Sequence, residues 1–207
     1  MINLESRIKN HKSTIGVIGL GYVGLPLTIR FSEEGFKTIG FDIDHEKVSM
    51  LNDGRSYIKH IKEADISKIA NNGFTATTDF RKIANVDVII ICVPTPLGVH
   101  NEPNLSFIHG TLENIKPYLR ENQLLILEST TYPGTTEEIL VPFIESIPDS
   151  SLITHHFSPS VKTSSLVIPQ NAKIQAIKTI QPKPFQKWLV ALRKTALNSP
   201  KHSTTKS

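Results

Sequence analysis

The sequence predicts an α/β fold built on a doubly wound parallel sheet over residues 1–159, and three observations support this prediction. Short β-branched runs alternate with segments of helical pattern, as in βαβ units. Residues 86–93 are almost entirely apolar, which is typical of a parallel strand covered on both faces. A glycine-rich turn stands between the first predicted strand and the first long predicted helix.

The elements follow one another in a regular order. Strands are expected at residues 14–19, 37–42, 74–77, 86–93, 123–128 and 152–157. Helices are expected at residues 23–34, 46–51, 61–70 and 105–119, and a further helix is expected to open at a capping box made by Thr135 and Glu138. Asn-Asp-Gly and Asn-Asn-Gly, ending at Gly54 and Gly73, are turn signals. From residue 160 to residue 207 only residues 185–197 have a helical pattern, so an irregular basic tail is predicted, either disordered or with one short helix.

Composition divides the chain at the same place. The 207 residues are 39% hydrophobic and 20% charged, which is typical of globular proteins. Residues 151–207 contain nine Lys and Arg and no acidic residue, whereas residues 1–150 contain 14 basic and 19 acidic residues. No apolar stretch is long enough to cross a bilayer and no secretory signal is recognisable, so a cytoplasmic location is expected.

Gly19, Gly21 and Gly24 form a GxGxxG motif after the first strand, and Asp42 ends the second strand. This context is the dinucleotide-binding fingerprint of a Rossmann-type fold. Gly19 allows a tight turn, Gly21 lets the backbone approach a pyrophosphate, and Gly24 lets the helix pack closely. The Asp42 carboxylate can accept hydrogen bonds from ribose hydroxyls and would repel a 2′-phosphate, so NAD is expected rather than NADP. The alternative is a glycine-rich turn that serves another ligand.

Three other features have competing interpretations. Cys92, the single cysteine, ends a strand where ligands bind, but it is better interpreted as a small buried residue than as a nucleophile. The eight histidines form no HxxxH or HExxH pattern, so no metal site is expected. The hydroxyls of Ser129 and Thr131 are expected on the cofactor side of the sheet, where they can contact the cofactor, serve ordinary turn and capping roles, or do both.

The segments IGVIGLGYVGLPL, GFDID, SYIKHI, TDF, ICVPTPL, EPNLSFI and ESTTYPGTTEE together closely resemble the UDP-glucose/GDP-mannose dehydrogenase family over residues 14–159. Within this family, the sequences of the segments SYIKHI and ESTTYPGTTEE are most similar to those of UDP-N-acetylglucosamine 6-dehydrogenases of bacterial surface-polysaccharide synthesis. The resemblance implies oxidation of the C6 alcohol of a UDP-sugar to a carboxylate, with two NAD consumed.

The resemblance also implies residue roles. Tyr22 and Val23 would give backbone N–H groups to the pyrophosphate held by the glycine loop, and Lys47 would lie near the ribose held by Asp42. Ser129 would lie near the nicotinamide, and Thr131 would be both a cofactor contact and part of the catalytic site. The segment that lines the cofactor past the fourth strand would consist of Val93, Pro94 and Thr95.

The resemblance ends after Phe157-Ser158-Pro159. Ser160 stands where the family has its active-site glutamate, and the catalytic cysteine, lysine and asparagine have no counterpart. The UDP-binding domain and the dimerisation helix are also expected to be absent, which suggests a frameshift or comparable lesion. We therefore expect a chain that is inactive alone, with self-association through exposed apolar surface or complementation by a separate chain as further options.

The alternative is a non-catalytic protein that binds NAD or interacts through the basic tail around Trp188. Because the tail carries no recognisable nucleic-acid motif, neither a nucleic acid nor a membrane is expected as its partner.

Overall fold

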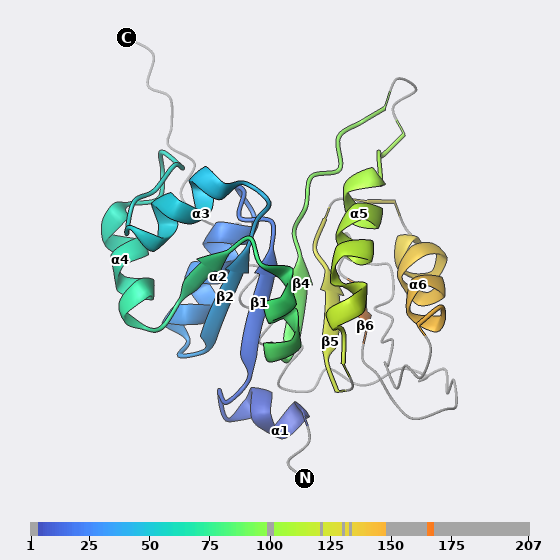
Figure 1. The fold of residues 1–207 in the computed structure, drawn as a ribbon, viewed down its shortest axis with the longest axis horizontal. Helices are drawn as coiled ribbons and strands as arrows, with labels where there is room; N and C mark the ends of the chain where they lie inside the picture. Colours follow the sequence, from blue (N-terminus) through green and yellow to red (C-terminus); the bar gives the residue numbers. More distant parts are fainter. Residues whose placement is uncertain are drawn as a thin grey trace. The chain divides into compact units, whose positions relative to one another are not determined.

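The computed structural model describes residues 4–98, 102–120, 122–129, 131–132, 134–147 and 165–167. Its sheet has the strand order β3-β2-β1-β4-β5-β6 (Figure 1). Five strands are parallel, and β6 (Ser165–Val167) runs antiparallel to β5. The parallel strands are β1 (Thr14–Ile18), β2 (Lys37–Phe41), β3 (Thr75–Thr77), β4 (Val88–Ile91) and β5 (Leu124–Leu127).

The strand order reverses at β1, which confirms the predicted doubly wound sheet. Ile15 of β1 pairs with Thr38 of β2 on one side and with Val88 of β4 on the other. The chain therefore leaves β1 in one direction to build β2 and β3, and later returns to build β4 and β5 on the opposite side. In such sheets ligands bind outside the carboxyl ends of the strands at this switch point.

Helices connect the strands. They are α1 (Leu4–Lys9), α2 (Gly24–Glu33), α3 (His45–Asn52), α4 (Glu63–Asn71), α5 (Ser106–Ile115) and α6 (Val141–Glu145). Shorter helical turns cover Phe80–Asn85 and Lys116–Tyr118, and a π-helical turn covers Thr136–Leu140. The helix predicted over residues 105–119 ends early because Pro117 has no N–H to continue the α-helical bonding, and a 3₁₀ turn follows.

The predicted capping box at the last helix is wrong. The Thr135 hydroxyl donates to the carbonyl of Tyr132 at 2.8 Å. The Glu138 carboxylate accepts from the Tyr132 hydroxyl at 2.6 Å, while the Glu138 N–H bonds the carbonyl of Gly134. Tyr132 therefore engages both side chains that the capping box requires.

Two apolar clusters cover the two faces of the sheet. Successive strand residues point to opposite faces, and this alternation separates Phe41 from Gly40. Phe41 belongs to the cluster under α5 and α6, whereas a Cβ on Gly40 would lie 2.8 Å from the Leu20 side chain of the other cluster. This second cluster is Leu20, Leu25, Leu51, Ile58, Ile61, Ile66, Ile69, Phe74 and Ala76, with Ile29, Val48 and Tyr57 packed against it.

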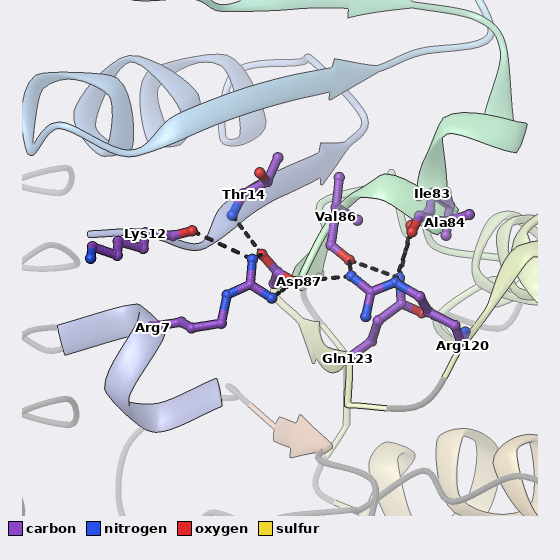
Figure 2. A network of polar contacts seen from close by, with 9 residues as sticks. All are labelled: Arg7, Lys12, Thr14, Ile83, Ala84, Val86, Asp87, Arg120 and Gln123. Carbon is purple, nitrogen blue, oxygen red and sulfur yellow. Dashed lines mark hydrogen bonds and ion pairs between the residues drawn. The ribbon is translucent and has the colours of Figure 1, made fainter. Parts of the chain in front are cut away.

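A polar network closes the amino edge of the sheet, where α1 lies below the strands in Figure 1. Figure 2 shows Asp87, only 1% exposed, between two arginines. Arg7 of α1 donates to both carboxylate oxygens at 2.8 and 2.7 Å, and Arg120 donates at 2.9 Å. The Thr14 N–H adds a bond of 2.9 Å. The sequence does not predict α1, and this network fastens it to β1 and β4.

Two predicted elements, the strand at residues 152–157 and the helix at residues 185–197, lie outside the described residues. The segment predicted to be irregular contains β6, a strand that the sequence does not predict. The chain divides into two units, residues 1–175 and 176–207, and the second lies wholly outside the described residues.

Candidate cofactor site

The glycine loop joins β1 to α2 at the switch point. Gly19 has a φ of +90°, and its N–H bonds the carbonyl of Phe41 at 2.8 Å. A Cβ on Gly19 would lie 2.7 Å from the carbonyl oxygen of Cys92. A Cβ on Gly24 would lie 1.8 Å from the carbonyl oxygen of Gly19. Both glycines are therefore required by the fold itself, for the turn and for close helix packing.

Gly21 is different because nothing in the structure occupies the space that its side chain would fill. A Cβ there would have no heavy atom within 4 Å, and its φ is not in the positive region. The absence of a side chain therefore has no packing explanation within the described part of the chain. It does leave room for a ligand to approach the backbone, as a pyrophosphate does in this motif.

The start of α2 is also open to an anion. Its N-cap, Val23, offers no side-chain capping bond, and its first turn carries no acidic residue. Within the described residues no hydrogen bond is seen from the N–H of Tyr22 or Val23, the two donors that the family resemblance implies. Both side chains point to solvent, with 77% and 58% exposed. Unpaired N–H groups at a helix N-terminus attract phosphate.

Asp42 lies at the carboxyl end of β2, beside the glycine loop. Its carboxylate is only 8% exposed and accepts one backbone bond on each oxygen, from Leu20 at 2.9 Å and from Asp44 at 3.1 Å. A carboxylate has about four acceptor positions, so positions remain for two ribose hydroxyls. Asp42 therefore both fixes the loop and keeps acceptor capacity at the edge of the site.

Lys47 lies in the first turn of α3, close to Asp44 and Tyr57. Its ammonium is 3.7 Å from the Asp44 carboxylate and 5.8 Å from the centre of the Tyr57 ring. Asp44 caps α3 by accepting from the N–H groups of Glu46 and Lys47, and these bonds, that from Lys47 most, lower its pKa. Lys47 is thus held near Asp42, because Asp44 contacts both residues.

The loops after β4 and β5 meet on the other side of the switch point. The hydroxyl of Ser129, a buried residue, donates to the carbonyl of Val93 at 2.8 Å. The next two residues of the β4 loop differ, since Pro94 is exposed and Thr95 is half-buried. The Thr131 hydroxyl is buried and has no hydrogen-bond partner among the described residues. An unpartnered buried hydroxyl is costly, and a cofactor or substrate bound at this edge would offset that cost.

Cys92 is a buried, packed residue directly after β4, which ends at Ile91 although the strand was predicted over residues 86–93. The Cys92 side chain is buried, and a Cβ added to Gly24 would lie 3.3 Å from the Cβ of Cys92. Burial, followed by the nearby Glu128 carboxylate, raises the pKa of the thiol well above its usual range. A thiol that stays protonated and buried is not a nucleophile at neutral pH.

Exposed apolar side chains stand in the loops that follow three of the strands. Large side chains that are more exposed than usual follow β1, β2 and β4, and they are Tyr22, Val23, Ile43 and Leu97. Such side chains suit the flat faces of an adenine or nicotinamide ring. In the part of the chain that the structure describes, no three His, Cys, Asp or Glu side chains gather as metal ligands.

Three residues at this edge were missed by sequence reasoning. They are Leu20, whose N–H bonds Asp42, Tyr57, whose hydroxyl bonds the Leu20 carbonyl, and His60, whose ring stacks on Tyr22. Tyr57 and His60 belong to the segment SYIKHI, which the sequence analysis used only as part of the family resemblance. Its tyrosine after a turn glycine was the available signal, but no local pattern shows which backbone atom it reaches.

A family model described as the UDP-glucose/GDP-mannose dehydrogenase family, NAD binding domain, matches residues 13–164. The chain belongs to this family. The family assignment and the Rossmann-type fold agree with the sequence analysis, and the cofactor of the family domain is NAD.

Two curated relatives and one solved structure illustrate the similarity. A UDP-N-acetyl-D-glucosamine 6-dehydrogenase of Pseudomonas aeruginosa is 34% identical over 63% of this chain and 30% of its own length. A UDP-N-acetyl-D-mannosamine dehydrogenase of Yersinia pestis is 36% identical over 67% of this chain and 33% of its own. The UDP-N-acetyl-mannosamine dehydrogenase Cap5O of Staphylococcus aureus superposes with a TM-score of 0.61 at 30% identity, covering 65% of this chain and 32% of that one.

The chain thus spans about a third of the length of the curated relatives it matches. The matched third is the cofactor domain, so the similarity shows a dehydrogenase NAD-binding domain and leaves the sugar to other arguments. No helix among the described residues has the length and hydropathy needed to span a membrane.

Proposed function

We propose that residues 14–159 are the NAD-binding domain of a UDP-sugar 6-dehydrogenase whose substrate is UDP-N-acetylglucosamine. In the whole enzyme this reaction oxidises the C6 alcohol to a carboxylate while two NAD accept hydride. The observation that carries the proposal is the open space over Gly21, beside an uncapped helix N-terminus and the Asp42 carboxylate.

Different residues of the chain bind different parts of the cofactor. Backbone N–H groups of Tyr22 and Val23 bind the pyrophosphate, with Gly21 giving it access. Asp42 accepts hydrogen bonds from the adenosine ribose, and Lys47 beside it binds through charge. Val93, Pro94 and Thr95 line the far half of the cofactor.

Ser129 and Thr131 face the nicotinamide end in this proposal. Ser129 acts mainly by tying the β5 loop to Val93, since its hydroxyl is already engaged. Thr131 keeps a buried, unpartnered hydroxyl, so it is the residue of this pair that has a hydrogen bond to offer a ligand. Its replacement by valine should weaken NAD binding with little change in fold stability, and unchanged binding would remove Thr131 from the site.

The proposed sugar is inferred from the sequences of the segments SYIKHI and ESTTYPGTTEE. Overall identity does not decide between the sugars, because relatives of nearly equal identity are named for different ones. A domain exchange tests the proposed sugar. Residues 14–159 would replace the matching part of the Pseudomonas aeruginosa UDP-N-acetyl-D-glucosamine 6-dehydrogenase or of the Yersinia pestis UDP-N-acetyl-D-mannosamine dehydrogenase. We expect NADH absorbance at 340 nm to recover more fully in the first chimera, and equal or reversed recovery would contradict the proposed substrate.

We also propose that the 207-residue chain alone does not turn over. Two successive oxidations need a thiolate to hold the sugar aldehyde, and the single cysteine, Cys92, is buried with a raised pKa. Purified chain with NAD and UDP-N-acetylglucosamine should give no NADH absorbance. A steady rate that scales with protein concentration would overturn this part of the proposal.

A further inference from the structure

The segment at residues 56–61 lies against the glycine loop. Ile58 and Ile61 are buried and belong to the second apolar cluster, so they anchor the segment. Tyr57 and His60 instead contact the glycine loop. The Tyr57 hydroxyl donates to the Leu20 carbonyl at 2.5 Å, and the His60 ring stacks on the Tyr22 ring with centroids 6.0 Å apart and planes 21° apart.

These contacts hold Leu20 at both of its backbone polar groups. Its N–H donates to Asp42 at 2.9 Å, its carbonyl accepts from Tyr57, and its side chain is fully buried. The Leu20 carbonyl and the Gly21 N–H belong to one planar trans peptide and point in opposite directions. The bond from Tyr57 therefore fixes the direction of the Gly21 N–H, away from the Tyr57 hydroxyl.

The tyrosine is suited to act as a constant donor. Burial, followed by the Asp42 and Asp44 carboxylates, raises the pKa of Tyr57 well above its usual range, so the hydroxyl stays protonated at physiological pH. The Lys47 ammonium, on α3, lies over the ring, 5.8 Å from its centre. The second apolar cluster packs against the remainder of the side chain.

We propose that Tyr57 is a positioning residue for the cofactor pyrophosphate. Its hydroxyl fixes the Leu20–Gly21 peptide, so that the N–H groups of the glycine loop are already aimed when the phosphates arrive. Preorganised donors bind more tightly because no ordering cost remains to be met on binding. The inference rests on the proposed NAD site and adds a residue outside the glycine motif to it.

The role predicts an effect confined to ligands that carry the pyrophosphate. Tyr57→Phe removes only the hydroxyl, and Tyr118→Phe is the matched control because Tyr118 lies in the turn after α5, on the amino side of β5. Binding of NAD and ADP would be measured by calorimetry, and binding of adenosine by ligand-observed NMR. For Tyr57→Phe we expect NAD and ADP to bind about fivefold more weakly, the effect of one neutral hydrogen bond. Adenosine affinity should stay unchanged, and the cooperative unfolding transition should remain, with a midpoint lowered slightly by the lost hydrogen bond. Tyr118→Phe should bind all three ligands as the wild type does.

A second measurement needs no ligand. Amide hydrogen exchange at Gly21 and Tyr22 should be faster in Tyr57→Phe than in the wild type, with exchange in β5 unchanged. Equal weakening of adenosine and ADP, wild-type affinity for NAD, or loss of the cooperative unfolding transition would each overturn the inference. A folded wild-type chain that binds neither NAD nor ADP would overturn the proposed function as well, whereas wild-type binding that Tyr57→Phe leaves intact overturns only the role of Tyr57.

Discussion

Replacing Gly21 by alanine is expected to weaken NAD binding strongly while leaving the fold intact. The new methyl group would meet no protein atom within 4 Å, and the backbone of Gly21 is not in the left-handed region. At a compatible position Gly→Ala commonly stabilises a protein by about 0.4–1 kcal/mol, because it restricts the unfolded chain. The unfolding free energy should therefore stay the same or rise slightly.

The effect on binding is opposite and larger. The methyl group would occupy the space through which the pyrophosphate reaches the N–H groups of the loop. Hydrogen bonds to charged groups contribute about 1.5–3 kcal/mol each, so loss of even one weakens NAD binding by about 10- to 150-fold.

Gly24→Ala is the matched control from the same motif. Its methyl group would lie 1.8 Å from the backbone oxygen of Gly19, so α2 must move away from β1. We expect a clear loss of stability there, measured by urea denaturation, alongside calorimetric titration of both variants with NAD. If Gly21→Ala binds NAD as the wild type does, or if it is as destabilised as Gly24→Ala, the reasoning about the open space is refuted.

Three further predictions follow from the structure. Asp87→Ala should cost about 1.5–3 kcal/mol of stability, the range for hydrogen bonds to a charged group, because Arg7, Arg120 and the Thr14 N–H lose a buried acceptor. Chemical denaturation measures this, and a change in NAD affinity would contradict its place at the far edge of the sheet. The raised pKa of Cys92 means that the unfolded thiol ionises before the folded one, so the free energy of unfolding should fall above about pH 8.5, by up to about 1.4 kcal/mol per pH unit. Cys92→Ala should lack this pH dependence. Parallel profiles of unfolding free energy against pH for the two proteins would refute the prediction. Asp42→Asn should reduce the preference for NAD over NADP, because the charge that repels a 2′-phosphate is gone. The Kd for each cofactor would be measured by calorimetric titration. An unchanged ratio of the NADP Kd to the NAD Kd would count against the ribose role of Asp42.

Features written in short stretches of sequence were predictable. The apolar run before Cys92 predicted the parallel sheet, and the spacing of the glycine motif predicted the turn between β1 and α2, because each depends on local sequence. The strands were predicted to extend one or more residues too far. Gly19 and Asp42, for example, follow strand-forming residues in the sequence but already belong to the loops after β1 and β2.

Features that depend on distant partners were not predictable. Arg7 and Asp87 are 80 positions apart, and neither residue's neighbours mark the pairing. Tyr57 reaches a backbone carbonyl 37 positions away, which no side-chain pattern encodes. The capping box failed for a related reason, because Tyr132 competes for both of its side chains.

Calorimetric titration of the wild-type chain with NAD, after circular dichroism has shown cooperative unfolding, tests the central claim most directly. We expect a saturable isotherm with one NAD per chain and a Kd at least about tenfold lower than that for NADP, since the proposed ribose partner, Asp42, carries a charge that would repel a 2′-phosphate. A cooperatively folded chain that gives no saturable heat with NAD would contradict the assignment of this site as a dinucleotide-binding domain.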